Sequence, residues 1–297
     1  MKKLDYRRYG ELVQFASKDK TMLTGFLMEP KEGRRDVCLI HVHGMTDNFY
    51  GSERPFSIGA EVSRHGIVTF SMNTRGHDSI SVIGKTPSRR SKKNGFLGGT
   101  SMERFEDCLL DIDGAISAMR KRGYNRFILS GHSTSCQKVT YYQYKKQNRK
   151  VIGIILLSPA DDYNSNVKKL GRKHAAAVKR SKELIKMGNG GWPLKEIPFF
   201  FSPKRFLSVA DLRNVEARLF NYDGEMREFS AIKTPVCVFF GSKEQYAVKP
   251  VREYMRILKE KSGAEVTCHI IKGARHSFRK HEKEVSEAVA RWAAGLV

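Results

Sequence analysis

The stretch RFILSGHSTSCQK, residues 126–138, decides the fold. Its apolar start is followed by Gly131, His132, Ser133, Thr134 and Ser135, and then by a segment of helical character. A serine on a tight strand-to-helix turn needs small residues two positions before it and two positions after it, because strand and helix approach closely there. Gly131 and Ser135 meet that need, although glycine is more usual at the second position. The stretch therefore predicts a strand, a turn that presents Ser133, and a helix.

Outward from this turn, short apolar runs rich in β-branched residues alternate with segments of helical period. This pattern is typical of an α/β fold with a mostly parallel central sheet flanked by helices. The predicted strands are Val37–Val42, Ile67–Met72, Arg126–Ser130, Val151–Leu157, Pro235–Phe240 and Val266–Ile271.

The best-marked helix is predicted over Thr100–Gly123. Thr100 and Glu103 have the spacing of a capping box, and Gly123 is expected to end the helix. Its apolar side chains recur at intervals of three and four: Phe105, Cys108, Leu109, Ile112, Ile116 and Met119. Two further helices are predicted, one after Pro250 and one that includes Val285 and Trp292.

Residues 161–230 break this alternation. They are rich in Lys, Asn, Gly and aromatic residues and show no strand-like pattern. We therefore predict an α/β core formed by residues 1–160 and 231–297, with residues 161–230 as a cap insertion above the sheet. Apolar stretches such as Ile197–Phe201 indicate that the cap packs on other parts of the chain.

A serine hydroxyl becomes a useful nucleophile when a base lies within hydrogen-bond reach and an acid orients that base. His276 follows the last predicted strand, at the sheet edge where open α/β sheets place their sites. Glu244 follows the strand TPVCVFF, which gives the order serine, acid, histidine. Asp161 and Asp162, which follow the preceding strand, are alternative acids. The predicted triad is therefore Ser133, His276 and Glu244, with this alternative open.

Hydrolysis of an acyl bond also needs two backbone donors for the oxyanion. Thr134, directly after the serine, is expected to supply one. Met45, in the turn after the strand LIHV, is expected to supply the other, because Gly44 permits a sharp bend there. We therefore predict an oxyanion hole formed by the amides of Met45 and Thr134.

Three other polar features have structural interpretations. His41 and His43 share one face of a strand and could hold a metal, but no further ligand cluster completes a set, so no metal site is predicted. The turn Arg75–Asp78 is interpreted as a structural hydrogen-bond network. Cys136, just past the turn, is predicted to be a buried thiol.

Composition narrows the class of protein. No apolar run approaches the roughly 20 residues of a membrane span, and the N-terminus MKKLDYRRYG lacks the apolar segment of a secretory signal. Five cysteines lie far apart, which favours reduced thiols. These features predict a soluble cytoplasmic protein. The 54 basic and 31 acidic residues give a net charge of +23, which should attract anions of any kind.

The motifs HVHGM, NTRGHDS, GHSTSCQK, GSKE and GARHS, in that order, resemble the α/β-hydrolase superfamily over nearly the whole chain. The elbow GHSTSCQK together with HVHGMTDNFY is most similar to a branch related to fungal siderophore esterases. The resemblance implies that Ser133 is the nucleophile, His276 the base and Glu244 the acid, with Met45 and Thr134 at the oxyanion hole. It also implies that residues 161–230 form a cap over the pocket.

These features predict a serine esterase that needs no cofactor and acts on a small-molecule ester, with an anionic ester favoured by the net charge. Thioesterase, lactonase, peptidase or acyltransferase chemistry would use the same residues. A different class remains open, a non-catalytic protein that binds anions or nucleic acid on a hydrolase scaffold. Against nucleic acid, the basic stretch KTPSRRSKK, residues 85–93, has no interleaved aromatic residues. The sequence does not indicate an oligomeric state.

Overall fold

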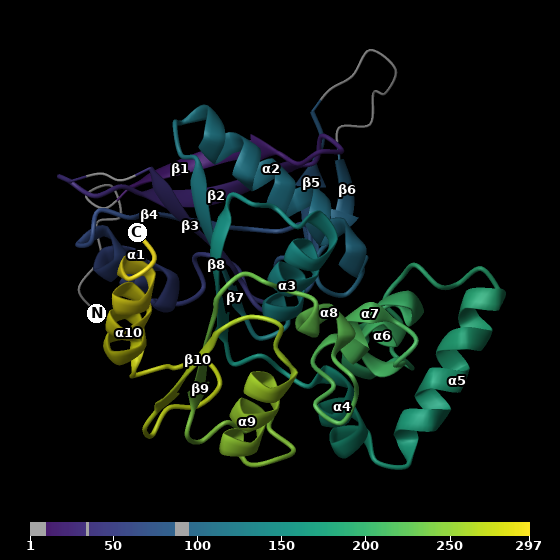
Figure 1. Cartoon of the computed structure of the whole chain (residues 1–297). Coiled ribbons are helices and arrows are strands. Elements are labelled where there is room, and N and C mark those ends of the chain that lie inside the picture. The colour runs from purple at the N-terminus through teal and green to yellow at the C-terminus, as the bar shows by residue number, and fades with distance from the viewer. Residues whose placement is uncertain (1–9, 34–35, 87–94) are drawn as a thin grey trace.

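The computed structural model describes residues 10–33, 36–86 and 95–297. The basic stretch 85–93 therefore lies mostly outside the described residues. Within them the central sheet has eight strands in the order β1-β2-β4-β3-β7-β8-β9-β10 (Figure 1). The strands are β1 (Glu11–Ala16), β2 (Met22–Met28), β3 (Val37–Val42), β4 (Val68–Met72), β7 (Arg126–His132), β8 (Val151–Leu157), β9 (Val236–Gly241) and β10 (Val266–Ile271).

Most neighbouring strands of this sheet are parallel. β1 pairs antiparallel with β2, and β2 pairs antiparallel with β4, whereas each pairing from β4 to β10 is parallel. A separate hairpin consists of β5 (Ser81–Gly84) and β6 (Gly95–Gly98). The predicted α/β class is thereby confirmed, and every predicted strand is present within one or two residues of its expected bounds.

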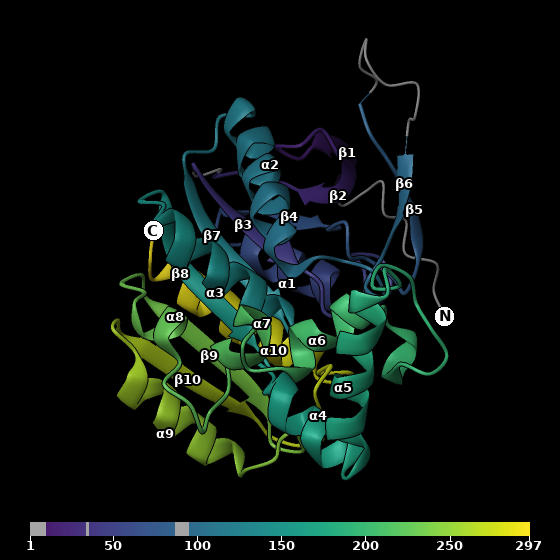
Figure 2. The ribbon, with the colours of Figure 1, turned by 90° about the vertical axis from the view of Figure 1, so that its right-hand side faces the viewer.

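Helices cover both faces of the sheet (Figures 1 and 2). α1 (Arg54–Ser63) and α10 (Glu282–Ala294) pack on one face, while α2 (Cys108–Lys121), α3 (Ser135–Lys146) and α9 (Val251–Lys261) pack on the other. Along β3, Val37 and Leu39 belong to the apolar cluster that includes α1 and α10. Cys38 and Ile40 belong to the cluster on the opposite face, which includes α2, α3 and α9. Both faces of a central strand are therefore buried, as its continuous apolar sequence predicts.

The start of α2 differs from the prediction. The α-helix begins at Cys108, after a single 3-10 turn over Phe105–Asp107. Thr100 does not cap it, because its hydroxyl donates to the Gly76 carbonyl and accepts a bond from the Thr46 amide. Glu103 is likewise engaged elsewhere, in an ion pair with Lys138. Both residues of the predicted capping box therefore bond to distant parts of the chain and do not cap the helix.

Between β8 and β9 the chain is helical in its described residues, with α4 (Asp162–Leu170), α5 (Lys173–Lys186), α6 (Pro203–Ala210), α7 (Val215–Leu219) and α8 (Arg227–Ser230). α5 lies at the right-hand side of Figure 1, away from the central sheet. Leu184 and Phe206, on α5 and α6, belong to an apolar cluster of their own. Leu219 and Phe229, on α7 and α8, pack in the main core.

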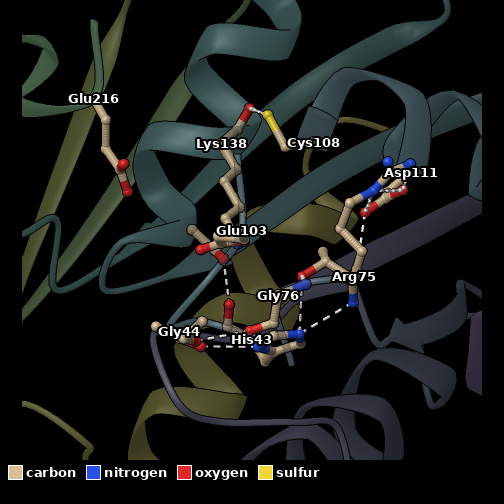
Figure 3. Close-up of polar contacts among 12 residues, drawn as sticks. His43, Gly44, Arg75, Gly76, Glu103, Cys108, Asp111, Lys138 and Glu216 are labelled. Carbon is tan, nitrogen blue, oxygen red and sulfur yellow. Dashed lines mark hydrogen bonds and ion pairs between the residues drawn. The ribbon is translucent and has the colours of Figure 1, made fainter. Parts of the chain in front are cut away.

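Buried charges connect this helical region to the sheet. Lys138 Nζ lies 2.7 Å from Glu103 Oε2, and Figure 3 shows these two side chains together. Arg205 Nη2 lies 3.3 Å from Glu103 Oε1. The Arg205 guanidinium also forms a two-pronged pair with Glu216. These four side chains are at most 3% exposed. The network links α6 and α7 to α3 and to the loop before α2.

No helix among the described residues combines the length and the apolar content that a membrane span requires.

Candidate active site

The parallel strands end at one edge of the sheet, and the predicted site residues follow those ends. Met45 comes after β3, Ser133 after β7, Glu244 after β9 and His276 after β10. Met45, Ser133, Thr134 and His276 line one cavity of about 560 Å³. The topology therefore gathers residues that lie up to 231 positions apart in sequence around one hollow.

Ser133 occupies a strained turn between β7 and α3. Its φ is 56°, in the left-handed region that non-glycine residues rarely adopt, and its amide donates to the Leu157 carbonyl at 2.9 Å. A Cβ on Gly131 would lie 2.3 Å from the Ser135 carbonyl oxygen, so the turn requires glycine there. The Ser135 hydroxyl donates to the His43 carbonyl. The serine that stands in place of the usual second glycine thus ties the elbow to the end of β3.

His276 and Glu244 form a buried pair. The Nδ1 atom of His276 lies 2.9 Å from Glu244 Oε1, and the two side chains are 9% and 3% exposed. Since a carboxylate accepts hydrogen bonds, this contact places the imidazole proton on Nδ1 and leaves Nε2 as the basic nitrogen. The ring of Tyr246 packs edge-on against His276, with 4.7 Å between ring centroids.

The alternative acids have other partners. Asp161 caps α4 by accepting the Asn164 amide, and it also accepts the Tyr222 amide. Asp162 lines the cavity and accepts a hydrogen bond from Gln137 at 2.8 Å. Of these three carboxylates, Glu244 is the one with a hydrogen bond to His276.

Side chains from three other segments hold the backbone around His276. The His276 amide donates to Gln245 Oε1 at 3.1 Å, and the His276 carbonyl accepts from His132 Nε2 at 3.0 Å. Arg54 donates to the next carbonyl, that of Ser277, at 3.1 Å. No feature of the sequence predicted this role for Arg54, Gln245 or His132. Only His132, inside the elbow motif, offered any local signal.

The loop after β3 lies directly against the elbow. A Cβ on Gly44 would lie 3.0 Å from His132 Nδ1 and 3.2 Å from Ser133 Cβ, so a larger residue would press on the serine. Asp47, further along this loop, pairs with Arg54 at 3.2 Å. The predicted oxyanion donor Met45 therefore lies between two residues that other segments hold: the His43 carbonyl accepts from Ser135, and Asp47 pairs with Arg54. The second predicted donor, Thr134, precedes the first residue of α3, where the helix dipole favours negative charge.

Buried histidines on and after β3 are engaged by the protein. His43 Nδ1 donates to the Gly44 carbonyl, and Nε2 accepts the Thr74 amide. His41 Nδ1 lies 3.0 Å from Ser130 Oγ. Burial lowers the pKa of His43 to about 4 and that of His41 well below its usual value. Among the described residues, no group of three or more His, Cys, Asp or Glu side chains could hold a metal.

The turn after β4 and the thiol after the elbow have structural contacts. Arg75 forms ion pairs with Asp19, Asp107 and Asp111, and Figure 3 shows its guanidinium against Asp111. Cys136 is buried and bonds to the Gly131 carbonyl, and burial raises the pKa of its thiol well above the usual value. Both observations agree with the structural interpretation of these residues.

Residues between β8 and β9 also line the cavity. Phe199 and Phe201 line it, as does Lys169. Trp192 does not line it and is 62% exposed.

Comparison with known families gives one match that covers more than half of the chain. The model of a family described as "Protein of unknown function (DUF1749)" matches residues 94–293. The chain belongs to this family. The matched region includes the elbow, Glu244 and His276, but it does not include the loop of Met45. No curated protein sequence matches the chain significantly.

Several solved structures share the fold at low sequence identity. The siderophore hydrolase EstB from Aspergillus fumigatus has a TM-score of 0.67 at 15% identity, covering 97% of this chain and 98% of its own. A thermostable carboxyl esterase from Bacillus coagulans has 0.63 at 16%, covering 97% and 99%. Est1E from Butyrivibrio proteoclasticus has 0.60 at 14%, covering 95% and 97%. The chain therefore has the α/β-hydrolase fold that its motifs predicted.

Proposed function

We propose that this protein is a serine hydrolase that cleaves a carboxylic ester through a Ser133-His276-Glu244 triad and an acyl-enzyme intermediate. The observation that carries the proposal is the buried His276–Glu244 pair, whose His276 lines the same cavity as Ser133, a serine on a left-handed turn. A turn of this kind is costly for a non-glycine residue, and such strain is typical of functional sites. The solved relatives named as esterases support this class of reaction.

In the proposed reaction Ser133 Oγ attacks the carbonyl carbon of the ester while His276 Nε2 takes the hydroxyl proton. Glu244 keeps the other ring proton on Nδ1 and stabilises the imidazolium that forms. The amides of Met45 and Thr134 bind the oxyanion of the tetrahedral intermediate. His276 then gives its proton to the leaving alcohol, and a water molecule hydrolyses the acyl-enzyme by the same steps.

The same triad could carry out related reactions. Ser133 would attack a thioester or a lactone in the same way, and an acyltransferase would use an alcohol or amine in place of the water. A screen of 4-nitrophenyl esters of increasing acyl length, followed by lactones and thioesters, separates these alternatives by relative kcat/KM.

A fluorophosphonate probe tests the triad without knowledge of the substrate, because it reacts with activated serines. We expect the wild type to be labelled and Ser133→Ala to be unlabelled. Ser165→Ala is a matched control, since Ser165 lines the same cavity from α4 and has no place in the triad. It should be labelled like the wild type. Equal labelling of the wild type and Ser133→Ala would refute the proposal.

A further inference from the structure

The charged side chains that line the cavity differ in how their charges are compensated. Arg54 and Asp47 form an ion pair at 3.2 Å, so their charges cancel. Asp162 is half-buried and accepts a hydrogen bond from Gln137. Burial raises the pKa of Asp162 well above its usual value, which favours the neutral acid. Neither group therefore gives the cavity a net charge.

Lys169 is the exception. It lines the cavity from the last turn of α4, and no ion pair recorded among the described residues includes it. Its Nζ lies 4.5 Å from the centroid of the Phe199 ring, on the same cavity wall. An ammonium over an aromatic face keeps its charge and its hydrogen-bond donors, because the ring accepts no proton. This wall of the cavity is therefore positively charged.

The backbone beside Lys169 is held in an unfavourable conformation. Phe199 and Phe200 both have positive φ values, 63° and 54°. Bulky residues rarely adopt this region, and such residues persist only where the surrounding structure fixes them. At Phe199 this conformation accompanies a ring that faces both the cavity and the lysine.

Lys168 shows that the position of Lys169 is specific. Both lysines lie in the last turn of α4, where a cation stabilises the helix dipole. Lys168 does not line the cavity, and its Nζ donates to the Ala247 carbonyl at 3.4 Å. A role confined to the end of the helix would apply equally to both residues, whereas a role toward a bound molecule applies to Lys169 alone.

We propose that Lys169, beside the ring of Phe199, binds a carboxylate carried by the substrate ester and so selects anionic esters over neutral ones. This inference rests on the proposed function for the identity of the reacting bond. It is more specific than the net charge of +23, because it assigns the preference to one side chain on one wall.

Two esters of similar length test the proposal: 4-nitrophenyl hemiadipate, a monoanion, and 4-nitrophenyl heptanoate, which is neutral. A hydrogen bond to a charged group corresponds to roughly a 10- to 100-fold change in affinity. We expect Lys169→Gln to lower kcat/KM for the hemiadipate by about 10-fold or more, mainly through KM, and to leave the heptanoate within about twofold. Lys168→Gln should leave both unchanged. The effect of Lys169→Gln should persist at high salt, where long-range steering is screened.

A binding measurement separates failure of this inference from failure of the proposed function. Titration calorimetry with adipate should show binding to the wild type and to Lys168→Gln, and weaker binding to Lys169→Gln. Adipate binding that depends on Lys169 without any ester turnover would refute the esterase and leave the carboxylate site supported. Turnover of both esters with equal response to Lys169→Gln, or adipate binding unaffected by that substitution, would overturn the carboxylate site.

Discussion

Replacing Glu244 by glutamine should nearly abolish activity, because the change removes a charge without changing the shape of the side chain. Glu244 Oε1 accepts from His276 Nδ1 at 2.9 Å and from the Tyr246 amide at 3.2 Å. If the glutamine keeps its oxygen there, its NH₂ group takes the place of Oε2, which is buried without a hydrogen-bond partner. If the amide is reversed, its NH₂ group faces two donors and forces the imidazole into the wrong tautomer.

In either orientation the imidazolium loses its counter-charge, and at 3% exposure water does not replace it. The corresponding acid-to-amide change in the general serine triad costs about 10⁴ in kcat, equivalent to about 5 kcal/mol of transition-state stabilisation. We expect a loss of about 10³- to 10⁴-fold for Glu244→Gln. Glu244→Asp should retain more activity, because the carboxylate remains but is one methylene further away.

The assay is the second-order rate of fluorophosphonate labelling, with 4-nitrophenyl ester hydrolysis as a second readout and urea unfolding to show that each variant is folded. Asp162→Asn is the control for the alternative acid, and it should stay within about threefold of the wild type because Asp162 has no bond to His276. The reasoning would be refuted if Asp162→Asn lost activity by orders of magnitude while Glu244→Gln stayed near the wild type.

Two predictions concern stability. Because His43 is buried with a pKa of about 4 instead of 6.5, the unfolded chain binds a proton that the folded chain does not. The stabilisation that neutral His43 gives the folded state is therefore complete above pH 6.5. The free energy of unfolding falls by about 3 kcal/mol from this group as the pH drops to 4. The free energy of unfolding, measured by urea titration at each pH in this range, should depend less steeply on pH for His43→Gln than for the wild type. An unchanged pH dependence would contradict the assignment to His43. Arg205→Met should cost about 3–5 kcal/mol, because it leaves the Glu216 carboxylate buried without its cation and removes one of the two cations that pair with Glu103. Arg180→Met, which breaks an exposed pair with Glu196, should lower the free energy of unfolding by less than about 1 kcal/mol. Equal losses for the two variants would contradict the larger contribution expected of the buried network.

Features carried by short stretches of sequence were predictable. The continuous apolar runs of β3 and β8 depend on neighbouring residues alone, and their predicted bounds agree with the structure. The apolar periodicity after Pro250 likewise predicted the helix that the structure shows as α9. The elbow was also predictable, since close approach of strand and helix demands glycine at position 131. Ser133, Glu244 and His276 each follow a predicted strand. Because parallel strands end at one edge of the sheet, the sequence predicted that these three residues lie at the same edge.

Features that depend on which distant segments meet were decided by the tertiary structure alone. Thr100 and Glu103 have the spacing of a capping box, yet contacts with residues 24 and 35 positions away determine what they bond. Arg54 reaches the loop of His276 from 223 positions away. No local pattern marks such a partner, because the free energy of a buried hydrogen bond or ion pair depends on what the folded chain brings within 3 Å and removes from water.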